Sequence, residues 1–141
     1  METETMNSCW QEFLGASGAR IDNGSIAEFG NLSAELVAAQ EATVIAPLLH
    51  LGLIEFTGED ATSFLHNQVT SDVNHLTADS AQHSAWCSAK GRMLASFLLY
   101  RQGTDFRALL SADLIAETQK RLQMFVLRSK VKIAEIGRAH V

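Results

Sequence analysis

Hydrophobic residues at the start of this chain recur with the period of a helix. In residues 6–15 they stand at positions i, i+4, i+7 and i+8, the spacing of one apolar helix face: Met6, Trp10, Phe13 and Leu14. This spacing predicts a short amphipathic helix. Residues 15–30 are rich in Gly, Ser, Ala and Asn, which predicts a loop or an extended lead-in. Residues 34–42 fit either a second helix or extended chain, and Pro47 prevents either from continuing.

An organised core begins at Leu49, where apolar positions become dense. Residues 51–57 are apolar enough for a buried strand. The run 58–60, Gly-Glu-Asp, then opens a helix, and its two carboxylates suit the positive end of the helix dipole. The residues that share one face of this predicted helix are Ala61, Phe64, Leu65 and Gln68.

Three strand-like segments follow a polar loop that ends near Ser80. They cover residues 82–89, 93–101 and 106–110, and turns that contain glycine separate them. Residues 112–127 predict a helix, and residues 131–133 resemble the start of another strand. The apolar side of that helix is expected to carry Ile115, Leu122, Phe125 and Val126. This order of elements predicts an α+β fold in which helices pack on an antiparallel sheet.

The charge balance narrows the classes of partner. The 141 residues are enough for one domain, and they carry 11 basic and 16 acidic side chains, a net charge of −5. We therefore expect no direct binding to nucleic acid. A local basic patch stays open as a possibility, at Lys120, Arg121, Arg128, Lys130 and Lys132.

Cysteine and histidine positions argue against a metal site or a disulfide framework. Cys9 and Cys87 lie far apart, and no two of the five histidines have the i, i+4 spacing of helical metal ligands. Residues 1–5 lack a basic leader, and no apolar run approaches the roughly 20 residues that span a bilayer. We expect a reduced, cytoplasmic protein with no bound metal and no membrane partner.

Two segments carry the most specific information: residues 67–73, Asn-Gln-Val-Thr-Ser-Asp-Val, and residues 87–93, Cys-Ser-Ala-Lys-Gly-Arg-Met. In this combination and spacing they resemble the N-terminal half of a folate-binding protein of the YgfZ type, within the glycine-cleavage T-protein superfamily. The resemblance covers roughly residues 51–133. Cys87 follows Trp86 in an apolar predicted strand, so we expect it to be a small, buried or half-buried apolar residue and not a reactive thiol. The family's Lys-Gly-Cys-(Tyr/Phe)-x-Gly-Gln-Glu segment does not occur in this chain, and the resemblance implies that it would belong to a missing half.

The resemblance implies tetrahydrofolate as the cofactor, and it implies binding residues in the two segments. Thr70 and Asp72 are candidates to accept hydrogen bonds from amino groups of the ligand, although capping a turn is the commoner role of such residues. Lys90 lies in a hairpin turn, where its charge is available to the glutamate tail of a folate or simply to solvent.

An overlay on the aminomethyltransferase of the superfamily, anchored on Tyr100, adds two residues. It places the catalytic aspartate of that enzyme on Ser96 and its folate-contacting asparagine on Ser111. A serine cannot supply the carboxylate that meets the folate nitrogen during one-carbon transfer. The resemblance therefore implies a folate pocket lined by Ser96 and Ser111 but no catalytic residue.

The function implied by this resemblance is that of a tetrahydrofolate-binding protein without transferase activity. Such a protein would support the assembly or repair of iron-sulfur enzymes, with a link to tRNA modification, and its partners would be folate and iron-sulfur enzymes or assembly proteins. One alternative is an aminomethyltransferase of glycine cleavage. Another is the folate-binding domain of a tRNA-modification GTPase, although the chain has no Gly-x-x-x-x-Gly-Lys-(Ser/Thr) loop.

The expected organisation has three parts. Residues 1–48 form an N-terminal helix and lead-in, residues 49–134 form a truncated folate-binding domain, and residues 135–141 form a non-native tail. The tail is suspected because Glu-Ile-Gly-Arg-Ala-His-Val is what GAG ATC GGA AGA GCA CAC GTC encodes, which resembles a sequencing adapter. We further expect that a strand begun at Val131 lacks a later partner in the sequence.

Overall fold

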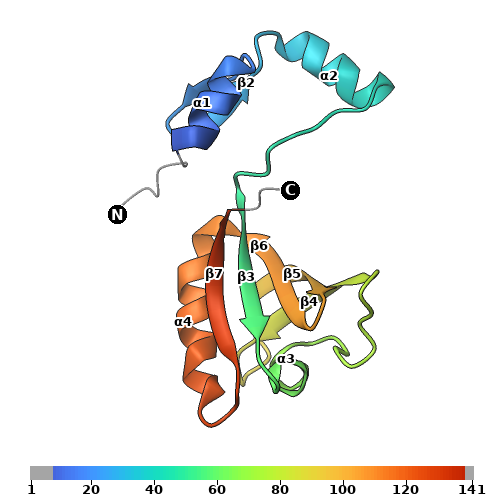
Figure 1. Ribbon diagram of the computed structural model, residues 1–141, viewed down its shortest axis with the longest axis vertical. Coiled ribbons are helices and arrows are strands. Elements are labelled where there is room, and N and C mark those ends of the chain that lie inside the picture. Colours follow the sequence, from blue (N-terminus) through green and yellow to red (C-terminus); the bar gives the residue numbers. More distant parts are fainter. Residues whose placement is uncertain (1–7, 139–141) are drawn as a thin grey trace. The chain divides into compact units, whose positions relative to one another are not determined.

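A computed structural model describes residues 8–138 (Figure 1). The chain divides between Ala46 and Pro47 into two compact units, and each is described by itself. Met6 of the predicted N-terminal helix lies outside the described residues. Within residues 8–138, no helix is both long and apolar enough to cross a bilayer.

The first unit contains two helices and a small hairpin. Helix α1 spans Ser8–Ala16 and buries Leu14, whereas Phe13, expected on the same apolar face, is 59% exposed. Strands β1 (Arg20–Asp22) and β2 (Ser25–Glu28) pair antiparallel where loop or lead-in was predicted. Asn23 and Gly24 join them with φ of 48° and 76°, which is the backbone that the Asn-Gly dipeptide favours in a two-residue hairpin.

Residues 32–41 settle the choice that the sequence left open, because they form helix α2 (Leu32–Glu41). Its N-terminus is capped by Asn31, whose side-chain oxygen accepts a hydrogen bond from the backbone N–H of Ala34 at 3.0 Å. Such a cap satisfies one of the N–H groups that a helix start leaves without an intrahelical partner.

The second unit is an α+β structure built on one antiparallel sheet, as predicted. Its five strands lie in the order β4-β5-β6-β3-β7. The elements run in sequence as β3 (Leu51–Thr57), α3 (Ala61–Gln68), β4 (Ala81–Cys87), β5 (Met93–Gln102), β6 (Asp105–Ser111), a 3-10 turn η1 (Ala112–Leu114), α4 (Ile115–Val126) and β7 (Lys132–Arg138). The predicted segments agree with these bounds to within two residues, except that β7 is longer and the 112–127 helix starts as a 3-10 turn.

Strand β7 takes its partner from earlier in the sequence. We expected no later partner for a strand at Val131, but β7 pairs with the earlier strand β3, where Phe56 lies opposite Ile133 and Ile54 opposite Glu135. This pairing continues to Gly52 opposite Arg138, so the predicted boundary at residue 134 falls inside a strand. The origin of residues 135–141 stays a prediction.

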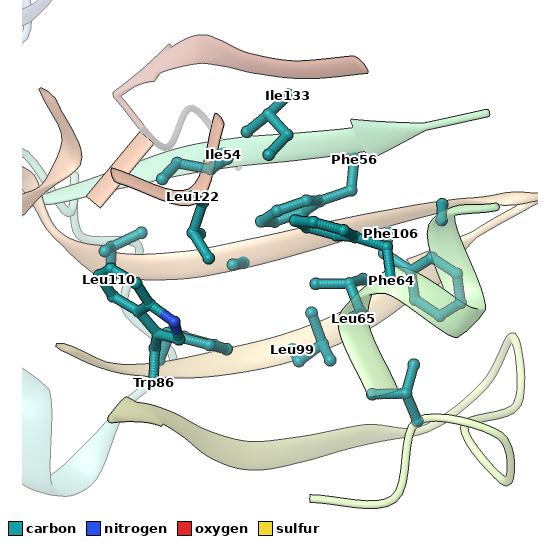
Figure 2. Packing of buried hydrophobic residues seen from close by; sticks show 14 of the residues in the cluster. Ile54, Phe56, Phe64, Leu65, Trp86, Leu99, Phe106, Leu110, Leu122 and Ile133 are labelled. Atoms are coloured by element: carbon teal, nitrogen blue, oxygen red, sulfur yellow. The ribbon is translucent and has the colours of Figure 1, made fainter. Parts of the chain in front are cut away.

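Helices α3 and α4 share a single core with one face of the sheet. Ile54 and Phe56 of β3 belong to one buried cluster with Leu122 of α4 and Leu65 of α3. Figure 2 shows the rings of Phe56 and Phe106 lying together, with Phe64 of α3 beside them. Burial of Ala61, Phe64 and Leu65 confirms the predicted face of α3.

Two details of the helices differ from expectation. Helix α3 begins only at Ala61, and the Asp60 carboxylate accepts a hydrogen bond from the backbone N–H of Lys130 at 2.7 Å instead of capping the helix. On α4, Ile115 and Leu122 are buried as expected and Val126 is half-buried, but Phe125 is 49% exposed.

Candidate functional site

The face of the sheet opposite α3 and α4 carries a row formed by three leucines and the exposed His83, and we call this face the open face. Leu98 and Leu109 are half-buried, whereas Leu53 is 7% exposed. Antiparallel pairing sets Leu53 opposite Leu109, Leu109 opposite Leu98, and Leu98 opposite His83, so the row crosses four strands. Residues that lie directly opposite each other in such a ladder point to the same side of the sheet. None of these side chains belongs to the buried core shared with the helices, as far as residues 8–138 show.

An ion pair lies beside this row. Glu55 is opposite Arg107, and the carboxylate oxygen Oε1 accepts hydrogen bonds from Nη2 at 3.0 Å and from Nε at 3.2 Å. The two side chains are 23% and 27% exposed, and the Glu55 carboxylate raises the pKa of Arg107 above its usual value. Tyr100 lies opposite Arg107 on the next strand. Sequence reasoning did not single out this pair, although strand alternation from Leu53 and Leu109 points to it.

The open face brings two predicted site residues into one row. Ser96 on β5 lies opposite Ala85, and Ser111 at the end of β6 lies opposite Leu51. Continuing the β5–β6 register by two residues from Leu98 and Leu109 sets Ser96 level with Ser111. Both serines are exposed. Ser111 also donates a hydrogen bond from Oγ to Oδ1 of Asp113 at 2.5 Å, which places a carboxylate beside the row that the sequence did not reveal.

Thr70 joins the end of this row through the backbone. Its N–H donates to the carbonyl of Ala85 at 2.9 Å, and its Oγ1 accepts from the Ala85 N–H at 3.0 Å. Ala85 is the residue that lies opposite Ser96, so Thr70, Ala85 and Ser96 occupy neighbouring positions across the sheet. The structure therefore gives Thr70 an anchoring role at the edge of β4.

Asp72 is engaged within its own loop. Its Oδ1 accepts from the Asn74 N–H at 2.9 Å, its Oδ2 lies 2.6 Å from Nδ1 of His75, and Nδ1 of His66 lies 3.4 Å from Oδ1. The hydrogen bond with His75, followed by that from Asn74, holds the pKa of Asp72 below its usual value. This geometry corresponds to turn capping, the commoner of the two roles considered for this residue.

Lys90 lies apart from the row, in the exposed turn between β4 and β5. The turn is closed by the N–H of Gly91 donating to the Ser88 carbonyl at 2.8 Å and by the Ser88 N–H donating to the Arg92 carbonyl at 2.8 Å. Gly91 has φ of 77°, a conformation that glycine adopts without strain. Cys87, just before the turn, is half-buried.

Within residues 8–138, no group of three or more His, Cys, Asp or Glu side chains is arranged to hold a metal ion. The open face presents the hydroxyl groups of Ser96 and Ser111 beside the leucine row. The Asp113 carboxylate lies against Ser111, and the Glu55–Arg107 ion pair lies beside the row. Such a surface can hold a flat, partly apolar ligand and orient it by hydrogen bonds.

Comparison with known proteins identifies relatives of two kinds. Over 89 residues the chain is 35% identical to the tRNA-modifying protein YgfZ of Vibrio vulnificus, which covers 63% of this chain and 28% of that protein. Over 101 residues it is 30% identical to the aminomethyltransferase of Bacillus cytotoxicus, which covers 71% of this chain and 28% of that enzyme. The chain is a homologue of both.

The chain thus spans 28% of the length of these two relatives. No family model matches it. Among solved structures, the glycine cleavage system aminomethyltransferase T of Bartonella henselae matches with a TM-score of 0.71 over 96% of this chain and 38% of that enzyme, at 17% identity. The structural match shows the fold, and with the two relatives it confirms the resemblance drawn from residues 67–73 and 87–93. The individual site residues remain predictions.

Proposed function

We propose that this chain forms part of a reduced-folate-binding protein of the YgfZ type that does not transfer a one-carbon unit. In this proposal it binds tetrahydrofolate on the open face and acts in the cytoplasm to support the assembly or repair of iron-sulfur enzymes. The YgfZ relatives are named tRNA-modifying proteins, and we extend that link to this chain.

The observation that carries the proposal is Ser96. The overlay on the aminomethyltransferase puts the catalytic aspartate of that enzyme at this position, and in this structure Ser96 is exposed on the open face opposite Ala85. A hydroxyl can donate to or accept from a pterin, but it does not ionise near neutral pH and cannot stabilise a positive charge on a folate nitrogen as a carboxylate does.

The open face has the groups that a reduced folate needs. The half-buried Leu98 and Leu109 offer an apolar surface for the pterin and benzoyl rings. Ser96 and Ser111 offer hydroxyls for the polar edge of the pterin. Lys90 would meet the glutamate tail as an exposed cation. Thr70 and Asp72 would act indirectly, because their polar atoms already hold the loop before β4 in place.

Asp113 supports the aminomethyltransferase as the second candidate, because its carboxylate lies against Ser111 at the same end of the open face. A relative named aminomethyltransferase is also 30% identical to this chain. The two candidates make opposite predictions for catalysis, although both predict folate binding.

Two measurements test the proposal. Isothermal titration with tetrahydrofolate should give saturable binding that Ser96→Trp weakens by about tenfold or more. The control Ser63→Trp, at an exposed position of helix α3, should leave binding unchanged. An aminomethyl-transfer assay with glycine-cleavage partner proteins should show no turnover, in this chain and in any longer protein that contains it. Robust turnover that is lost on Asp113→Asn would instead establish the transferase, and an absence of folate binding would reject both candidates.

A further inference from the structure

A strained leucine ends helix α4. The N–H of Ser129 donates to the carbonyl of Val126 at 2.8 Å and closes a four-residue turn. Leu127 is the second residue of this turn, with φ of 46° and ψ of −104°, close to the position in a type II′ turn that glycine normally occupies. A side chain with a Cβ is strained there. Leu127 is nevertheless 88% exposed, so burial within this chain does not account for a leucine at this position.

Leu127 lies at the rim of a concave apolar surface. An open hollow of about 690 Å³ is lined by residues 125–129 and Asp60, and we call it the α4 hollow. Phe125 is 49% exposed in this hollow, and Met124 beside it in sequence is 63% exposed. The ring of Phe125 meets the ring of the buried Trp86 edge to face, with centroids 6.2 Å apart. The lining is thus exposed on one side and supported by the core on the other.

The charge around the α4 hollow is opposite to that of the whole chain. The segments that form the hollow and its surroundings, residues 58–60 and 115–132, carry five basic and three acidic side chains, a net charge of +2, whereas the whole chain has a net charge of −5. The nearby carboxylates are already engaged, because Asp60 accepts from the Lys130 N–H at 2.7 Å and Glu59 pairs with the Lys130 ammonium at 2.7 Å. Within residues 8–138, exposed Arg128 makes no ion pair and is available to a ligand.

We propose that the α4 hollow docks a segment of a partner protein in which an apolar side chain is flanked by carboxylates. The apolar side chain would lie against Phe125 and Leu127, and a carboxylate would pair with the guanidinium of Arg128. An open hollow of about 690 Å³ with an exposed guanidinium beside it suits a short peptide segment that carries both apolar and acidic side chains. The proposal does not depend on folate binding, because α4 lies on the opposite side of the sheet from the open face.

The test uses a displayed library of random short peptides, selected on the 141-residue chain. Enriched peptides should combine an apolar residue with flanking Asp or Glu. With Trp10→Phe as background, Trp86 is the only tryptophan, so its emission should change when a selected peptide binds beside Phe125. Arg128→Glu and Leu127→Gly should each weaken binding by about tenfold or more, while the matched charge control Arg92→Glu should not change it.

The stability of Leu127→Gly separates docking from a structural role. If the role of Leu127 is to bind a partner, Leu127→Gly relieves the strained turn and the melting temperature does not fall. Peptide binding is nevertheless weakened by the loss of the side chain. The proposal is overturned if Leu127→Gly lowers the melting temperature and leaves binding intact, or if the enriched peptides lack carboxylates. It is also overturned if the hollow instead mediates self-association of the chain, or if Leu127 and Arg128 bind phosphatidylglycerol vesicles in place of peptides.

Discussion

Gly58 connects β3 to α3 at the point where the chain before α3 meets the chain before β7. A Cβ at this position would lie 2.0 Å from the carbonyl oxygen of Lys130 and 3.2 Å from the Cα of Val131. Both are backbone atoms, so no side-chain rotation removes the clash. At the same place, the N–H of Lys130 donates a hydrogen bond to the Asp60 carboxylate. Gly58→Ala should therefore separate two segments that are 70 residues apart in the sequence.

The magnitude follows from two costs. A side chain at φ of 119° costs about 1–3 kcal/mol, and forcing residues 130–131 away costs about 1–3 kcal/mol more as overpacking. Gly58→Ala should thus lower the free energy of unfolding by about 2–6 kcal/mol, measured by urea unfolding with far-UV circular dichroism. Gly91→Ala is the matched control, because Gly91 has φ of 77° but no atom within 4 Å of its Cβ position, and it should cost only about 1–2 kcal/mol. Equal losses for the two variants would refute the crossing at Lys130.

Three further predictions concern the core and the polar groups. Phe64→Ala should lower the free energy of unfolding by about 3–5 kcal/mol because Phe64 is 5% exposed, and a melting temperature equal to that of Ser63→Ala would show that the register of α3 is wrong. Asp72 should titrate below 3.8 by NMR, so its contribution to stability is present above that pH and is lost as the pH falls through the lowered value; an Asp72 that titrates at 3.8 or higher would contradict its hydrogen bonds to His75 and Asn74. A double-mutant cycle of Glu55→Gln and Arg107→Met should give a coupling energy of about 1 kcal/mol in unfolding, and a value near zero would mean that the pair is only geometric.

Local patterns were sufficient to predict most of the second unit. Residues 51–57 were predictable as a strand because the short segment is mostly apolar, and Phe64 and Leu65 are buried because helical spacing aligns them with Ala61. The pairing of β7 with β3 was not predictable in this way. In this pairing Phe56 lies opposite Ile133, which is distant in the sequence. A local sequence pattern does not indicate which distant strand pairs with a given strand. The hairpin at Asn23-Gly24 was predictable from its turn dipeptide, but its short flanking strands lack strong alternation.

The candidate site shows a similar limit. Ser96 and Ser111, which the overlay on the aminomethyltransferase indicated, are far in sequence from the motif residue Thr70. Only the strand register brings the three into one row across the sheet. The Glu55–Arg107 pair belongs to no motif, since each residue alone resembles an ordinary exposed charge. Lys90 and its turn were both predicted from the segment 87–93. The structure confirms the turn, but Lys90 lies outside the row that contains Ser96 and Ser111. Motifs therefore located the segments, and sheet topology determined which side chains can act together.

The measurement that tests the central claim most directly is a methyl NMR titration of the chain with tetrahydrofolate. The open face carries the methyl groups of Leu53, Leu98 and Leu109, and the helical side carries those of Ile54, Leu65 and Leu122 as an internal control. Our account predicts saturable shifts of the first set, with the second set nearly unchanged. Shifts confined to the second set, or no shifts at all, would contradict a folate site on the open face.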